Sequence, residues 1–329
     1  MSDLILVIKK IYAKRIVKVL TIIIIVLALG ILWQYGMSCY GSKSYTPPGK
    51  LIDVKNHKMH IYGEGEGRPT VVLTVGSGTP CAYTDYYSIQ KELMKTTRTV
   101  TYDRPGFGWS EITYTTGTID EQVSNLHELL NKAGEKPPYI LVGHSLSSLE
   151  VIHYAQLFPK EVEGIVLIDG GNPTIYANYN ESVALLSNRL FEGIRRVGLL
   201  RALGSVGIFP PLVGENIRHK LLPEKLQSVD EMMFYNNVGN ASNRSTLRNI
   251  NENASKVIKD GSLGDIPLVI LTAGQDHKWK ESQVELKDLS NNSKQEDIIG
   301  ANHYIHWSNS KIVIDRIKEL VDSSKKNVH

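Results

Sequence analysis

The chain alternates short apolar runs with amphipathic segments, and this rhythm constrains its fold more than any other feature. Runs such as TVVLTV (70–75) and YILVGH (139–144) are apolar over nearly their whole length, and a helical pattern follows each of them. Strands of continuous Val, Ile and Leu character are buried on both faces, as in a parallel sheet between two layers of helices. The sequence therefore predicts an α/β fold with a mostly parallel central sheet and helices on both faces.

The same pattern recurs along most of the chain. The expected strands cover residues 70–75, 98–103, 139–144, 164–169, 267–274 and 296–300, and the expected helices cover 86–94, 119–133, 146–157 and 311–321. Ahead of them, residues 51–67 alternate apolar and polar side chains on both sides of Lys55-Asn56-His57, which predicts a β-hairpin.

One long stretch, residues 173–264, interrupts this rhythm. It contains helical patterns at 182–197, 222–235 and 247–258 but no convincing strand. Insertions of this length between two strands are usually functional when they are ordered. We expect a helical lid at 173–264 and an α/β core formed by 50–172 and 265–329. Within the lid, residues 207–213 are expected either in the lid core or as an exposed apolar patch.

The N-terminal region holds an apolar run, VLTIIIIVLALGILW, at residues 19–33, with several basic residues ahead of it. A membrane-spanning helix needs about 20 residues. Residues 16–35 supply that length if Lys18 extends its ammonium group toward the lipid headgroups.

This run divides the N-terminal region into a basic segment (1–15), a transmembrane signal anchor (16–35) and a linker (36–49). Positive charge ahead of the run predicts a cytoplasmic N-terminus. The chain is then a single-pass protein of the cell membrane whose catalytic domain lies on the extracytoplasmic side. The alternative is a signal peptide cleaved near Gly36-Met37-Ser38.

Composition excludes several classes of function. The net charge of +3 is too small to indicate a nucleic-acid partner. Two cysteines, Cys39 and Cys81, form neither a disulfide framework nor a zinc site. We expect them as free thiols, and the alternative is that they pair with each other outside the cell. No metal and no organic cofactor is implied.

Gly143-His144-Ser145-Leu146-Ser147 directly follows an expected strand and opens an expected helix. A serine on such a sharp strand-to-helix turn is typical of a nucleophile elbow, and the residues two positions away must be small. The sequence therefore predicts Ser145 as a nucleophile. The alternative is a serine that only caps the helix.

A serine hydroxyl needs a base to accept its proton. His303 lies in Gly300-Ala301-Asn302-His303, just after the last expected strand, where a loop would bring it to the carboxyl edge of the sheet. His306 is the alternative base, although it lies further toward the next helix. We predict His303.

The imidazole in turn needs a carboxylate that orients it. Asp276 follows the expected strand 267–274 through a flexible Gly274-Gln275 segment, and Asp169 ends the strand 164–169. Both lie at the edge where ligands bind in open α/β sheets. Asp276 is favoured and Asp169 stays open as the alternative.

An oxyanion requires backbone N–H donors. We expect one from Leu146, the residue after the nucleophile, and a second from Ser77 in the glycine-containing loop 75–78. The alternative for this loop is a plain glycine turn.

These residues resemble the α/β-hydrolase superfamily, and within it the lid-bearing branch of esterases, proline iminopeptidases and epoxide hydrolases. The segment Asp103-Arg104-Pro105-Gly106-Phe107-Gly108-Trp109-Ser110 is similar to the D-x-x-G-x-G-x-S loop of that family, in which a structural role is expected. The resemblance covers residues 50–324 and matches its elbow to 143–147, its acid to Asp276 and its histidine to His303.

The resemblance departs from the family at two places. Val75-Gly76 stands where His-Gly is usual, and Ser147 stands in place of glycine. A serine nucleophile disfavours epoxide hydrolases and haloalkane dehalogenases, which attack with aspartate. The resemblance implies a serine hydrolase that cleaves a small-molecule ester through an acyl-enzyme. Amide or peptide hydrolysis of the proline-iminopeptidase type, a non-catalytic binding protein and an anchored lipid-handling protein remain alternatives.

Overall fold

The computed structural model describes residues 2–114, 116–207, 218, 220–274 and 277–327. Its centre is an eight-stranded sheet in the order β1-β2-β4-β3-β5-β6-β7-β8. The strands are β1 Lys50–Val54, β2 His57–Glu64, β3 Thr70–Thr74, β4 Thr99–Tyr102, β5 Tyr139–His144, β6 Val162–Ile168, β7 Leu268–Thr272 and β8 Ser293–Asp297. From β4 to β8 neighbouring strands are parallel, whereas β2 is antiparallel to both β1 and β4. The predicted fold class is confirmed.

The hairpin of β1 and β2 is also confirmed. Lys55 and Asn56 join the strands with φ of +46° and +69°. Two central residues with positive φ form the type I′ turn, whose twist matches that of antiparallel strands.

The last strand was misplaced by the sequence pattern. The apolar residues of 296–300 suggested a strand there, but β8 is Ser293–Asp297. Its residues are half-buried or exposed because β8 is an edge strand that pairs with β7 alone. A strand at this position needs no continuous apolar run, so its sequence lacks the expected signal.

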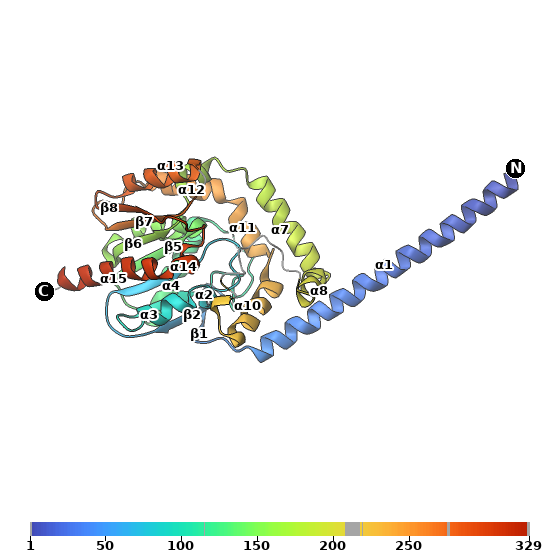
Figure 1. The fold of residues 1–329 in the computed structure, drawn as a ribbon, viewed down its shortest axis with the longest axis horizontal. Helices are drawn as coiled ribbons and strands as arrows, with labels where there is room; N and C mark the ends of the chain where they lie inside the picture. The colour runs from blue at the N-terminus through green and yellow to red at the C-terminus, as the bar shows by residue number, and fades with distance from the viewer. Residues whose placement is uncertain (1, 115, 208–217, 219, 275–276, 328–329) are drawn as a thin grey trace.

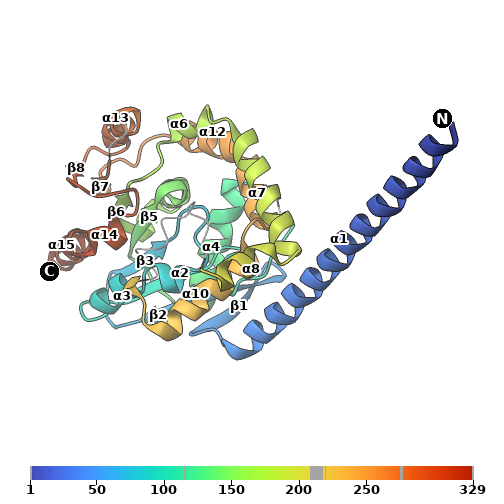
Figure 2. The ribbon, with the colours of Figure 1, turned by 45° about the vertical axis from the view of Figure 1, so that its right-hand side comes forward.

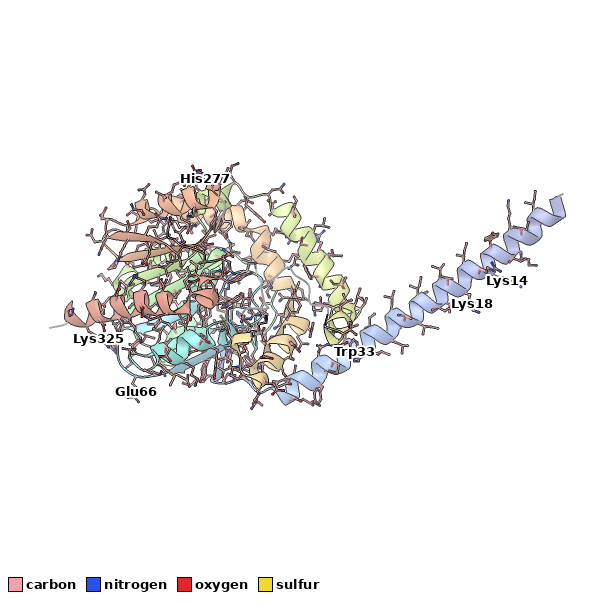
Figure 3. All side chains as sticks on the ribbon, in the orientation of Figure 1. Lys14, Lys18, Trp33, Glu66, His277 and Lys325 are labelled. Carbon is pink, nitrogen blue, oxygen red and sulfur yellow. The ribbon has the colours of Figure 1, made fainter. Side chains whose placement is uncertain are left out.

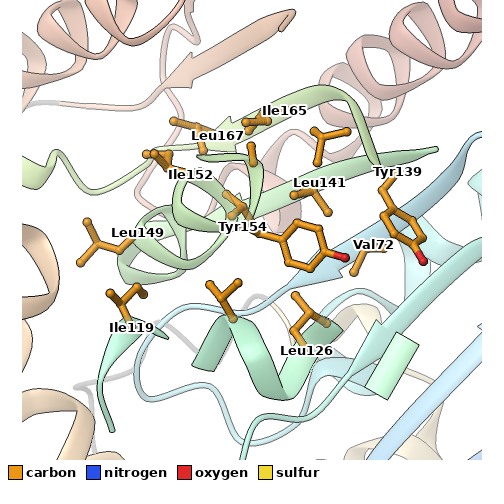
Figure 4. Packing of buried hydrophobic residues seen from close by; sticks show 14 of the residues in the cluster. Val72, Ile119, Leu126, Tyr139, Leu141, Leu149, Ile152, Tyr154, Ile165 and Leu167 are labelled. Carbon is orange, nitrogen blue, oxygen red and sulfur yellow. The ribbon is translucent and has the colours of Figure 1, made fainter. Parts of the chain in front are cut away.

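Helices cover both faces of the sheet (Figure 1). Those of the α/β core are α2 Ala82–Asp85, α3 Tyr87–Leu93, α4 Ile119–Ala133, α5 Ser148–Leu157, α13 His277–Glu285, α14 Ile305–Ser308 and α15 Ser310–Asn327. On one face, Leu126 of α4 and Ile152 of α5 pack with Val72 and Leu141 of the sheet (Figure 4). On the other face, α3 and α15 pack against the neighbouring strand residues, which point the opposite way.

Between β6 and β7 the described residues form helices. They are α6 Pro173–Ala177, α7 Glu181–Arg196, α8 Leu199–Ser205, α10 Glu224–Asn237, α11 Ala241–Arg248 and α12 Ile250–Asp260. We call residues 173–260 the helical insertion. The stretch 207–213, considered above as an apolar patch, lies outside the described residues except for Gly207.

Helix α1, Ser2–Ser44, extends away from the rest of the molecule in both views (Figures 1 and 2). Its segment Ile8–Ser44 is long and apolar enough to cross a membrane, a criterion that a signal sequence near an N-terminus also meets. The helix continues through residues 36–44, where a linker was expected.

The contribution of the buried sheet residues to stability can be tested by substitution. Leu141 of β5 has no exposed surface. Leu141→Ala should lower the free energy of unfolding by about 2–5 kcal/mol, because it removes buried methyl groups and leaves a cavity. Urea unfolding followed by tryptophan fluorescence measures this loss. The control Leu51→Ala, at a position 44% exposed on the edge strand β1, should change it by less than about 1 kcal/mol.

Candidate active site

Ser145 occupies a sharp turn between β5 and α5. Its φ is +53°, a left-handed conformation that is strained for any residue with a Cβ atom. The turn brings β5 and α5 so close together that a Cβ on Gly143 would lie 2.8 Å from Val151 Cγ2 and 3.2 Å from the Ser147 carbonyl oxygen. The small residue expected at position 143 is therefore required by geometry.

The Ser147 hydroxyl explains why this position tolerates serine in place of glycine. It donates to the carbonyl oxygens of Thr74 (3.0 Å) and His144 (2.9 Å), and it accepts a hydrogen bond from the His144 N–H (2.8 Å). Ser147 is completely buried. Its side chain thus ties the elbow to the end of β3.

His303 is hydrogen-bonded to Asp169, with 2.6 Å between His303 Nδ1 and Asp169 Oδ2. Asp169 follows β6 directly, next to the strand that carries Ser145, and is 2% exposed. Its other oxygen, Oδ1, accepts from the Ala273 N–H at 2.9 Å. The carboxylate is therefore held on both sides.

Asp276, the acid favoured from the sequence, lies outside the described residues. The acid that the structure places on His303 is the alternative, Asp169. Asp276 was favoured because a flexible Gly274-Gln275 segment could bring it to the histidine. The position of Asp169 depends instead on strand order, since β6, which it follows, lies next to β5.

His306 does not share this environment. Its side chain is fully buried, and its Nε2 lies 3.2 Å from Asp85 Oδ2. Trp307 donates to the other oxygen of the same carboxylate at 3.1 Å. His306 therefore belongs to a buried cluster around Asp85.

His144, which the sequence analysis did not single out, supports the loop that carries His303. Its Nε2 lies 3.0 Å from the His303 carbonyl oxygen, so this nitrogen carries the proton. Burial lowers the pKa of His144 well below its usual value, which keeps the ring neutral. Only the fold brings these residues together, 159 positions apart in sequence.

The loop after β3 runs beside the elbow. A Cβ on Gly76 would lie 3.2 Å from Ser145 Cβ, and Ser77 and Leu146 both line the cavity that contains Ser145. Arg104 donates to the carbonyl oxygens of Val75 (2.7 Å) and Gly76 (3.2 Å).

Arg104 is itself part of a buried polar network. Its guanidinium lies 3.5 Å from Glu150, which also accepts from the Tyr102 hydroxyl at 2.6 Å. Burial raises the pKa of Glu150 above its usual value, and the Arg104 charge opposes that shift. The neighbouring Asp103 accepts from the Ala82 N–H (2.8 Å) and lies 2.7 Å from His60 Nδ1. The segment 103–110 thus has the structural role expected for it.

Tyr176 of α6 is a further side chain near Ser145. It lines the same cavity as Ser145, and its hydroxyl is close enough to the Ser145 side chain for that side chain to influence its pKa. Its ring packs so closely on Gly171 that a Cβ there would collide with it. Burial raises the pKa of Tyr176 to about 12, so the hydroxyl keeps its proton near neutral pH. No sequence pattern pointed to Tyr176.

Ser145, Asp169 and His303 all line one cavity of about 840 Å³. Its roof comes from the helical insertion, through residues that include Tyr179, Ala184, Ser187, Asn188, Phe191, Phe234, Val238, Leu247 and Ile250. This lining is mostly apolar, which suits a small molecule with apolar groups. Among the described residues, no group of three or more His, Cys, Asp and Glu is placed to hold a metal ion.

Comparison with known proteins gives the same fold. Residues 69–310 match the family described as alpha/beta hydrolase fold. The chain is 31% identical to the uncharacterized protein YbdG of Bacillus subtilis over 229 residues, which are 69% of each chain.

Two solved structures illustrate the likeness. An esterase from Thermogutta terrifontis has a TM-score of 0.61 at 18% identity, over 83% of this chain and 98% of the esterase. An epoxide hydrolase from Bacillus megaterium has a TM-score of 0.65 at 18% identity, over 83% of this chain and all of the other.

The close approach of strand and helix at the elbow can be tested by substitution of Gly143. Gly143→Ala should destabilise the protein by about 1–3 kcal/mol, because the added methyl group overlaps Val151 and the Ser147 backbone. Urea unfolding measures the change. The same substitution at Gly193 of α7, where a Cβ would meet nothing within 4 Å, should leave stability unchanged or raise it. Equal effects at the two positions would contradict this account of the elbow.

Proposed function

Because the chain belongs to the α/β hydrolase fold family, we propose that it is a serine hydrolase that cleaves an ester through an acyl-enzyme. Ser145 is the nucleophile, His303 the general base and Asp169 the acid that orients the base. The observation that carries this proposal is the hydrogen bond between His303 and the buried Asp169, in the cavity that also contains the strained Ser145.

The proposed first step is attack of Ser145 Oγ on the ester carbonyl carbon. His303 Nε2 accepts the hydroxyl proton, while Nδ1–H donates to Asp169, which stabilises the imidazolium that forms. The backbone N–H groups of Ser77 and Leu146 stabilise the negative charge on the carbonyl oxygen. His303 then returns the proton to the leaving alcohol, and water cleaves the acyl-enzyme by the same route.

Two buried residues support the oxyanion site in this proposal. The amide of Ser77 follows the carbonyl group of Gly76, which accepts from Arg104. A fixed Gly76 carbonyl fixes the plane of the next peptide bond and therefore the direction of the Ser77 N–H. Arg104 and its partner Glu150 act as positioning residues.

Tyr176 supplies a neutral hydroxyl at the nucleophile. A protonated phenol can donate a hydrogen bond to an ester or alcohol oxygen but cannot take a proton from Ser145 at neutral pH. Tyr176 therefore helps to position the substrate, and His303 remains the base.

We also propose that α1 anchors the enzyme in the cell membrane as a single, uncleaved span, with the catalytic domain on the extracytoplasmic side. The helix is unbroken through Gly36-Met37-Ser38. Gln34 donates to the Tyr235 carbonyl oxygen at 2.8 Å, and Ser38 donates to Asn236 Oδ1 at 2.8 Å. Cleavage near residue 38 would remove the Gln34 contact from the folded domain.

The nucleophile is tested with a fluorophosphonate probe and a set of soluble p-nitrophenyl esters and aminoacyl-arylamides. The wild-type chain should be labelled, and Ser145→Ala should abolish both labelling and turnover. Ser323→Ala, on the exposed face of α15, is the matched control and should retain both. An unlabelled wild-type chain with Ser145 intact would instead indicate a non-catalytic binding protein, and turnover of the arylamides alone would indicate an amidase.

The acid is tested by comparing Asp169→Asn with Asp276→Asn. Asp169→Asn should lower kcat by about 10⁴-fold, since an amide leaves the His303 tautomer unfixed. Asp276→Asn should change kcat by only a few-fold. The reverse pattern would return the role to Asp276, and small, equal losses in both variants would refute both assignments.

A further inference from the structure

Helix α1 contacts the helical insertion through buried polar side chains. Gln34 is 6% exposed, although it follows directly on an apolar run. Besides donating to the Tyr235 carbonyl, it accepts from Arg201 Nε of α8 at 3.0 Å. These contacts fix where the helix meets the insertion.

A second contact lies closer to the N-terminus of α1, inside its apolar run. Gly30 lies against the turn between α7 and α8, where a Cβ would collide with the Val197 carbonyl oxygen. Gly198 lies in turn against the Gly30 carbonyl and the Trp33 ring. The insertion therefore touches α1 at residues that were expected within the membrane.

The length of the helix places this contact relative to the bilayer. The hydrocarbon core is about 30 Å thick. A helix rises about 22 Å from Arg15 to Gly30 and about 30 Å from Arg15 to Tyr35. If Arg15 marks the cytoplasmic boundary, the opposite boundary lies near Tyr35, and Gly30 lies inside it. Figure 3 shows Lys14 and Lys18 far along α1 from the domain, whereas Trp33 lies where the helix meets it. The turn at Val197 must then reach the surface layer of the bilayer.

The helix that leads into this turn exposes apolar side chains. On α7, Val183 is 66% exposed, Leu186 is 69% exposed and Leu190 is 62% exposed, and their spacing of three and four residues puts them on one face. Arg189 and Arg196 are exposed on the same helix. Apolar and basic side chains on one helix surface are typical of a helix that lies in a lipid interface.

The direction of α7 is compatible with a helix that lies in the lipid interface. In both views α7 runs across the direction of α1, on the side toward which α1 leaves the domain (Figures 1 and 2). If α1 crosses the bilayer, α7 lies along its surface.

A different face of the same helix lines the catalytic cavity. Ala184, Ser187, Asn188 and Phe191 contribute to its wall. The cavity and the exposed leucines are thus separated by a single helix, whose diameter is about 10 Å.

We propose that the exposed face of α7 (Val183, Leu186 and Leu190) and the α7–α8 turn lie in the surface layer of the bilayer that α1 crosses. An ester with a long apolar chain then enters the cavity beside α7 directly from the membrane. This inference rests on the anchoring and the ester hydrolysis proposed above. It adds the docking surface and the class of substrate.

A spin label reports the docking independently of catalysis. In a Cys39→Ser background, where the remaining Cys81 is buried, Leu190→Cys and Val284→Cys are labelled in vesicles of anionic and zwitterionic phospholipid. Val284 is 53% exposed on α13, away from α1 in both views. At position 190 the label should collide more with oxygen than with a water-soluble nickel chelate, and at 284 the order should reverse.

The failures of this experiment are distinguishable. The chain could stay in the vesicles after a carbonate wash while the label at 190 is as accessible to nickel as the label at 284. That result would overturn the docking of α7 but not the anchor. Dipolar broadening between labels could also appear and then disappear on dilution with unlabelled protein. That result would show that a second copy of the chain covers this face, and it would likewise overturn the docking to lipid. A chain that leaves the vesicles on washing overturns the anchor as well.

The substrate class is tested by a ratio of rates. Leu186→Glu/Leu190→Glu should lower the ratio of vesicle-borne long-chain ester hydrolysis to soluble short-chain ester hydrolysis by about tenfold or more, because charge replaces two leucines in the lipid interface. Val284→Glu should leave this ratio unchanged. An unchanged ratio in the double variant would overturn entry from the membrane, and the rate on the soluble ester shows separately whether the site is intact.

Discussion

The left-handed backbone at Ser145 is the constraint on which the rest of the site depends. A non-glycine residue in such a conformation costs on the order of 1–3 kcal/mol and persists only when its surroundings enforce it. Here Ser148 Oγ and the Gly171 N–H both donate to the Ser145 carbonyl oxygen, at 2.6 and 3.0 Å. The bond from Gly171 ties the elbow to the loop after β6, which begins with Asp169. The proposed nucleophile, Ser145, and the proposed acid, Asp169, are therefore placed relative to each other by this contact.

The polar groups buried beside the elbow have a related role. Arg104 and Glu150 are almost fully buried, and such pairs recover only part of their desolvation cost. Their hydrogen bonds go to carbonyl groups at Val75 and Gly76 and to the Tyr102 hydroxyl, so the charges hold a loop that has no regular structure of its own. His144 does the same for the loop of His303 without any charge. Polar side chains from inside the core thus orient the loops on both sides of Ser145.

Much of this architecture could be predicted from the sequence, and the exceptions have physical causes. The strands buried on both faces were predicted closely, because such strands are apolar over their whole length. The helix α4 was predicted closely because one buried stripe gives it a clear amphipathic pattern. The edge strand β8 has no such pattern and was misplaced. The elbow around Ser145 carries a local signature, because strand and helix approach within a few residues. The pairing of His303 with Asp169 and the approach of Tyr176 to Ser145 have none, since both depend on strand order and on the path of the insertion.

The absence of a break in α1 at the edge of the domain has a kinetic consequence. A domain on a flexible stalk can tumble and sample a volume of solution. If α1 is the membrane anchor proposed above, this domain must instead turn and diffuse together with its helix. Its reach is then a thin layer above the lipid, and its encounters depend on the number of substrate molecules per area of membrane. Crowding or dilution of the lipid should therefore matter more to such an enzyme than the concentration of ester in the surrounding water.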